Sequence, residues 1–209
     1  MTSRPSTTDA SGCPSFWRAL AVFALKKRRN RPIIAFCLIA AIAHTQNQMS
    51  EYAVKAAYLF NFGKFVRFAP SDEESNRQTF DICLVGDDPL GPRLETLTAN
   101  ERLDGKPVHV TRLKSAAEAR SCAIAYISAG ESARLGADLD SFRGQPVLTV
   151  SDTPNFLQQG GMIQFINVGN HVRFNVNLDA VRNAQLSLGS ELLKVAVSVS
   201  GQTPAEVRP

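Results

Sequence analysis

The sequence has few of the residues on which most enzyme active sites depend. Its 209 residues include only three histidines, four cysteines and one tryptophan. No His-x-x-His, Glu-x-x-His or Cys-x-x-Cys spacing occurs, so nothing in the sequence predicts a metal site. The Gly-x-Ser-x-Gly motif of serine hydrolases is also absent. We therefore expect a protein that is not an enzyme and that holds neither a metal nor another cofactor.

The excess of positive charge is confined to the first 43 residues. The whole chain has a formal net charge of +4. Residues 1–43 contain seven Lys or Arg and one Asp, whereas residues 44–209 contain 16 basic and 18 acidic groups, a net charge of −2. A broadly basic surface is the usual sign of a nucleic-acid-binding protein. Since residues 44–209 have no such excess, we do not expect a nucleic acid polymer as a partner.

No apolar run is long enough to span a membrane. The run 32–43 has 12 residues, well short of the ~20 that a spanning helix needs. It follows the basic segment 26–31 and closes in Ala41-Ile42-Ala43, an order typical of a secretory signal peptide. We expect residues 26–43 to be that signal peptide and the whole leader, residues 1–43, to be removed. An uncleaved membrane anchor is the alternative.

Removal of the leader would leave two cysteines, Cys83 and Cys122. In an oxidising compartment such a pair is a disulfide candidate. Each cysteine lies in a strand-like run, 80–85 and 122–127, and neighbouring strands can bring cysteines close enough to be bridged. The bridge could also respond to redox conditions. The alternative is two small buried side chains that never meet.

Residues 44–209 are expected to form one domain that begins with an amphipathic helix over Met49–Ala69, ahead of Pro70. Apolar residues recur there at helical spacing: Tyr52, Ala56, Leu59, Phe62, Phe65 and Val66. The aromatic set Phe60, Phe62, Phe65 and Phe68 is wider than one helix face needs. Part of this set is a candidate partner-binding surface, and the alternative is that all four residues are core.

Strand-like and helical segments alternate after residue 80. Strands are expected over 80–85, 107–110, 122–127 and 146–150. One helix is expected to start at Asp88-Pro89, and another to cover Glu131–Phe142. Pro89 and Pro154 are expected in first helical turns. A hairpin of 162–168 and 171–177 turns at Gly169-Asn170, and helices follow over 178–183 and 190–199, with Ser190 as N-cap. The pattern predicts an α/β fold, a layered sandwich with a mixed, largely parallel central sheet.

His171 and Arg173 lie two residues apart in the second hairpin strand. Side chains at that spacing point to the same face of a strand. An imidazole and a guanidinium side by side can receive an anion such as phosphate or carboxylate. This pair is the candidate ligand site, and the alternative is an ordinary solvated strand face.

Five segments of the sequence together resemble the YfiR family. They follow the family's order over about residues 50–200. The segments are Tyr58–Val66, Ile82–Pro89, Leu148–Asp152, Gly160–Ile163 and Asn170–Leu178.

This resemblance implies a dimeric, redox-sensitive periplasmic repressor. Such a protein binds the periplasmic sensor domain of a YfiN-like inner-membrane diguanylate cyclase and holds it inactive, which lowers cyclic di-GMP and biofilm formation. A YfiB-like outer-membrane lipoprotein would sequester the repressor. Cys83 and Cys122 match one cysteine pair of the family, whose second pair has no counterpart here.

The resemblance also bears on the candidate ligand site. His171 and Arg173 match positions associated with a nucleotide-like anion in a relative. A periplasmic small-molecule receptor or enzyme that uses this face as its pocket remains the alternative function.

Overall fold

The computed structural model describes residues 51–71 and 76–201, all within the unit formed by residues 48–209. The predicted leader, residues 1–43, lies outside the described residues. Among the residues described, no helix has the length and apolar character required to cross a membrane.

The first described element is the N-terminal helix, residues 51–65, which buries Ala56, Leu59 and Phe62 completely. The prediction that this helix continues to Ala69 is wrong. Val66–Phe68 form strand β1, which pairs antiparallel with β9, Leu186–Leu188. The amide of Gly189 donates to the carbonyl of Phe65, and the amide of Ala69 donates to the carbonyl of Gln185. Backbone partners from the distant segment 185–189 therefore end the helix before Pro70.

The large sheet has eight strands in the order β10-β8-β7-β6-β5-β2-β4-β3. Neighbouring strands are parallel except for the pairs β7–β8 and β3–β4. This arrangement confirms the predicted mixed, largely parallel sheet. The strands are β2 (Phe80–Val85), β3 (Arg102–Leu103), β4 (Lys106–Leu113), β5 (Ile124–Ile127), β6 (Leu148–Ser151), β7 (Ile163–Val168), β8 (His171–Asn177) and β10 (Ser198–Ser200).

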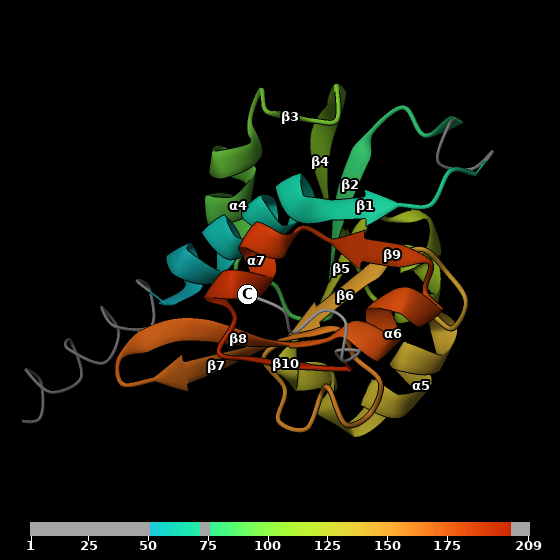
Figure 1. Cartoon of the computed structure of the whole chain (residues 1–209). Helices are drawn as coiled ribbons and strands as arrows, with labels where there is room; N and C mark the ends of the chain where they lie inside the picture. Colours follow the sequence, from blue (N-terminus) through green and yellow to red (C-terminus); the bar gives the residue numbers. More distant parts are fainter. Residues whose placement is uncertain (1–50, 72–75, 202–209) are drawn as a thin grey trace, which may run out of the picture. The chain divides into compact units, whose positions relative to one another are not determined.

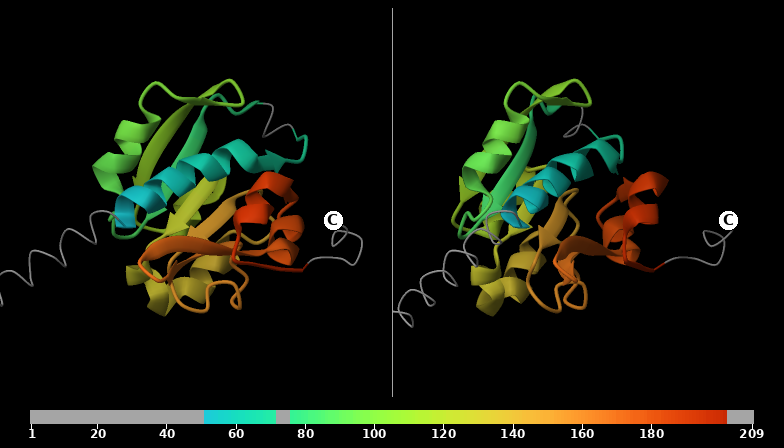
Figure 2. Two further views of the ribbon diagram at one scale, coloured as in Figure 1. Left: turned by 60° about the vertical axis from the view of Figure 1, so that its left-hand side comes forward. Right: turned by 90° about the vertical axis from the view of Figure 1, so that its left-hand side faces the viewer.

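Two apolar clusters cover the two faces of the sheet, as the alternation of side chains along a strand requires. In β2, Ile82 and Leu84 join a cluster with the N-terminal helix and with the helices α4 (Gly91–Thr98), α6 (Leu178–Asn183) and α7 (Ser190–Val195). Cys83 and Val85 point the other way, into a smaller cluster with the 3-10 helix η1 (Ala116–Ser121) and helix α5 (Leu135–Ser141). Figure 1 and Figure 2 show the N-terminal helix across one side of the sheet and α5 on the other. The layered α/β sandwich is confirmed.

Two of the predicted helices are shorter than expected. Residues 131–142 are divided between the 3-10 helix η2 and α5, and the helix expected over 190–199 stops at Val195 because β10 pairs with β8. Gly189 rather than Ser190 is the N-cap of α7. The helices are α4 (Gly91–Thr98), η1 (Ala116–Ser121), η2 (Ala129–Arg134), α5 (Leu135–Ser141), α6 (Leu178–Asn183) and α7 (Ser190–Val195).

Neither Pro89 nor Pro154 lies in the first turn of a helix, which corrects both predictions. Helix α4 begins two residues after Pro89 and has Pro92 in its first turn. Asp88 still serves the start of the helix, because its Oδ1 accepts a hydrogen bond of 2.5 Å from the amide of Gly91. Pro154 opens an irregular turn that runs to Gly160.

That turn explains the pair Gly160-Gly161. Gly160 has a φ of +99°, in the region that favours glycine. A Cβ on Gly161 would lie only 2.2 Å from the ring of Phe156, which is fully buried. One glycine therefore permits the turn, and the next permits the close packing beneath it.

Candidate functional site

Cys83 and Cys122 form a disulfide with a Cα–Cα distance of 6.1 Å. Cys83 lies in β2, and Cys122 lies between η1 and β5 rather than inside the strand. Strands β2 and β5 are hydrogen-bonded neighbours, so the bridge fastens η1 to a sheet that is already paired. Of the alternatives that the sequence left open, the bridged pair is confirmed.

The disulfide is shielded from solvent. Cys83 is 1% and Cys122 is 3% exposed, and both belong to the cluster between the sheet and α5. A reductant must reach a sulfur atom before it can exchange with the bridge. Reduction of this bridge therefore requires local opening of η1 or α5.

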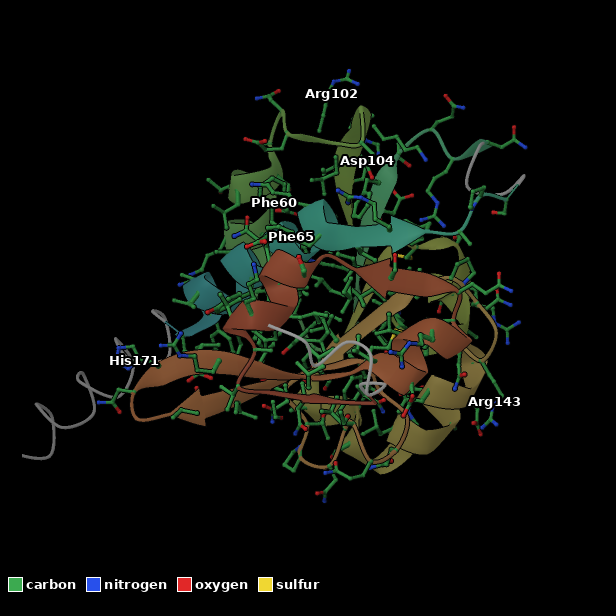
Figure 3. All side chains as sticks on the ribbon, in the orientation of Figure 1. Phe60, Phe65, Arg102, Asp104, Arg143 and His171 are labelled. Atoms are coloured by element: carbon green, nitrogen blue, oxygen red, sulfur yellow. A yellow bond between two sulfur atoms is a disulfide. The ribbon has the colours of Figure 1, made fainter. Side chains whose placement is uncertain are left out.

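The structure places His171 and Arg173 on the same face of β8, as their spacing predicts. Both side chains are exposed, whereas Val172, Phe174 and Val176 between and beyond them are buried. His171 lies at the turn end of the β7–β8 hairpin (Figure 3). The two side chains thus form an open patch on a strand face, and neither lines the cavities beside β4, α6 or β7.

The four phenylalanines divide into two groups. Phe62 is fully buried, with its ring centroid 5.8 Å from that of Phe165, and Phe60 is 8% exposed. Phe65 and Phe68 are only half-buried and pack at the margin of the larger cluster. Phe60 and Phe65 both project from the N-terminal helix (Figure 3). A partner can therefore reach Phe65 and Phe68 without disturbing the core.

A buried ion cluster at the end of β6 is the feature that the sequence reasoning missed. Lys55, on the N-terminal helix, is 4% exposed. Its Nζ lies 2.7 Å from Glu51 Oε1 and 2.7 Å from Asp152 Oδ2. The available signal was a lysine on the apolar face of the predicted helix, one turn from Tyr52 and Leu59.

The electrostatics of this cluster favour the charged lysine. Burial alone would lower the pKa of Lys55, but hydrogen bonds to Asp152 and Glu51 outweigh it and raise that pKa above its ordinary value. Burial, together with the charge of Asp152, raises the pKa of the nearby Tyr126 hydroxyl. The cluster borders a cavity of ≈ 330 Å³ that is also lined by Pro154 and residues 164–167 of β7.

Glu131 and Asp87 lie near the carboxyl ends of β2 and β5. A Cβ on Gly86 would meet the carboxylate of Glu131, and one on Gly130 would meet that of Asp87. No group of three or more His, Cys, Asp or Glu suited to a metal ion occurs among residues 51–71 and 76–201.

Comparison with known proteins gives one family. A family described as YfiR/HmsC-like matches residues 52–197. No curated protein matches the sequence.

Among solved structures, the chain is similar to a conserved domain protein from Vibrio cholerae O1 biovar eltor. The two are 8% identical with a TM-score of 0.44, over 58% of this chain and 55% of that one. The chain therefore spans about half the length of this relative.

Proposed function

This chain belongs to the YfiR/HmsC-like family of periplasmic regulators of cyclic di-GMP signalling, and on that premise we propose a specific regulatory role. The protein binds the periplasmic sensor domain of a YfiN-like inner-membrane diguanylate cyclase and holds the enzyme inactive. Cellular cyclic di-GMP and biofilm formation fall as a result. The observation that carries this proposal is the family match, which extends over nearly all of the described residues.

Such a role requires binding surfaces rather than catalysis. The family is regulatory rather than catalytic, and a regulator needs only a surface whose affinity for its partner differs between two states.

Residues 26–43 act in this proposal as a cleaved signal peptide that delivers the protein to the periplasm. A YfiB-like outer-membrane lipoprotein competes for the repressor, and the repressor itself is a homodimer.

The exposed pair His171 and Arg173 is proposed to bind an anionic group. Because the pair lies on an open strand face, it fits an acidic side chain of a partner better than an enclosed small ligand. A free nucleotide-like anion bound at the same face is the second candidate. Phe65 and Phe68 supply the apolar part of the partner contact, since they retain exposed surface.

The disulfide is proposed as the element that sets the active state. It holds η1 against β2 in the cluster that includes Leu135 and Phe142. Reduction would loosen these elements and weaken any binding surface that depends on them, by linkage. The proposal fails if Cys83→Ser protein represses as well as the wild type under both oxidising and reducing conditions.

Binding to the isolated periplasmic domain of a membrane diguanylate cyclase from the same organism tests the proposal. The His171→Ala/Arg173→Ala variant should bind that domain about tenfold more weakly than the wild type. Arg143→Ala is the matched control, since Arg143 is an exposed cation on another part of the molecule (Figure 3). A wild-type protein that binds nucleoside monophosphates but not the cyclase domain would instead support the small-molecule receptor.

A further inference from the structure

Strand β4 is open along one side. Its other side pairs with β2 over residues 108–113. On the open side, β3 covers only Lys106 and Pro107. Within residues 51–71 and 76–201, no other strand pairs with β4. An uncovered strand of this kind is a template for pairing with another chain.

The free backbone groups can be assigned from the hydrogen bonds. The carbonyl of Leu113 accepts from the amide of Gly86, which directly follows β2, so Leu113 and Thr111 direct their backbone groups toward β2. Val110 and Arg112 therefore direct theirs outward. The outward amide of Val108 already donates to the carbonyl of Glu101, at 3.1 Å.

These limits make the open edge symmetric about Thr111. It begins after Val108, ends with the strand at Leu113, and has Val110 and Arg112 as its outward residues. A second copy of β4, placed antiparallel, would satisfy the outward backbone groups of both residues. Val110 of each copy would lie opposite Arg112 of the other and exchange hydrogen bonds with it in both directions. The two Thr111 residues would then face each other directly, and Thr–Thr pairs across strands are favourable.

Charges at the ends of this register are complementary. In an antiparallel pair centred on Thr111, Lys114 of the other copy follows the last paired residues and continues toward Val108, whose outward amide is already bonded to Glu101. Glu101, bonded to Val108, lies at that end. Both Glu101 and Lys114 are exposed, and neither has an ion-pair partner among the residues that the structure describes.

The space beside the strand can take the partner. A groove of ≈ 620 Å³ is lined by the successive residues 107–111 together with Glu95, Thr98, Glu101 and Arg102. Because successive strand residues point to opposite faces, a groove that touches all of them runs along the edge. The charge of Arg112 does not oppose the pairing, since its guanidinium is bound to Asp88 at 2.5 Å and to Glu95 at 2.6 Å.

We propose that β4 pairs antiparallel with β4 of a second copy of this chain, in the register centred on Thr111, so that one sheet continues across a homodimer. The β3–β4 hairpin, whose tip carries Arg102 and Asp104, limits the pairing at each end (Figure 3). The interface does not depend on the cyclase. A protein that binds the cyclase domain yet lacks this contact would contradict the interface alone.

Crosslinking tests the register. Thr111→Cys places two thiols at a directly opposed, non-hydrogen-bonded pair with Cα atoms about 4.5 Å apart, close enough for a disulfide. Protein expressed from the full sequence should then migrate as a covalent dimer after mild oxidation. Ser187→Cys, an exposed strand residue on β9, is the control and should remain largely uncrosslinked. Equal crosslinking of the two variants would overturn the proposal.

A charge exchange provides a second test that does not introduce a thiol. Glu101→Lys and Lys114→Glu should each raise the dimer dissociation constant by about tenfold, since each alters two ion pairs per dimer. The double variant should restore the wild-type constant. Sedimentation equilibrium measures all four proteins. A wild type that is monomeric at 0.1 mM, or single variants that dimerise as the wild type does, would contradict the β4 interface.

Discussion

Lys55 and Asp152 are 97 residues apart in the sequence and are joined by an ion pair of 2.7 Å. The pair ties the N-terminal helix to the residue that follows β6. Asp152 also lies within the Leu148–Asp152 segment that carries the family resemblance. This contact therefore joins the N-terminal helix, just ahead of the Tyr58–Val66 segment, to a second segment of the resemblance, a connection that pattern alone could not make.

Lys55→Met should lower the free energy of unfolding by about 3 kcal/mol, because it leaves the partly buried carboxylates of Asp152 and Glu51 without their cation. Urea unfolding at pH 7 measures the change. The control is Lys64→Met on the same helix, since Lys64 is exposed and lies 4.4 Å from the ring centroid of Phe60. The two variants should differ clearly, and equal losses would contradict a special role for Lys55.

The contribution of Lys55 also has a defined pH range. Since the pKa of Lys55 is raised above its usual 10.5, its stabilisation is complete below that pH and is lost as the pH rises through the raised value. The difference between wild type and Lys55→Met should therefore be constant from pH 7 to 9 and shrink above about pH 10.5.

Asp138→Asn should stabilise the protein at pH 7 by about 1 kcal/mol, since Oδ2 of the buried Asp138 has no hydrogen-bond partner among the described residues. Burial raises the pKa of this carboxyl in the folded state despite Arg134 nearby. The folded state therefore binds the proton more tightly, and the wild type gains relative stability as the pH falls through that pKa. The advantage of Asp138→Asn should vanish in acid. Asp140→Asn, an exposed neighbour, should change stability by less than about 0.5 kcal/mol at any pH.

The double variant Cys83→Ala/Cys122→Ala should lose about 4 kcal/mol of stability, the chain-entropy value for a bridge across 39 residues. Because both sulfur atoms are buried, the folded wild type should also resist reduction. Mass spectrometry of alkylated thiols should show an intact bridge in dithiothreitol until denaturant is added. Rapid reduction of the folded protein would show that η1 or α5 opens more readily than its packing indicates.

Gly161→Ala should destabilise the protein by about 1–3 kcal/mol, since the new methyl group collides with the buried Phe156 ring. Gly136→Ala is the matched control, because Gly136 lies within α5 and a Cβ there has open space. That substitution should stabilise by about 0.5–1 kcal/mol through helix propensity. Thermal unfolding of both variants would separate a packing effect from a general intolerance of alanine.

Local sequence patterns predicted correctly those elements whose ends are set by their own sequence. Strands β2 and β8 and helix α6 have the predicted bounds. The apolar run of β2 stops before Gly86, and the alternation of β8 gives way directly to the helical pattern of α6. The alternation that placed His171 and Arg173 on one face holds for the same reason.

The errors occur where a distant segment decides the structure. Val66–Phe68 satisfy the helical period but pair with Leu186–Leu188 instead. Ser198 and Val199 leave the predicted last helix and, with Ser200, pair with Asn175–Asn177. The cluster around Lys55 joins residues from the first helix and from the end of β6. A lysine on an apolar face indicates a buried cation, but no local pattern tells which distant residues a segment will contact.

Cellular cyclic di-GMP in the native host tests the central claim most directly. It is measured with the gene deleted and then restored with and without the sequence of residues 1–43. If the protein is a periplasmic repressor, deletion should raise cyclic di-GMP, and only the form carrying the leader should return it to the wild-type level. An unchanged level on deletion, in cells that express the candidate cyclase, would contradict the proposed repressor.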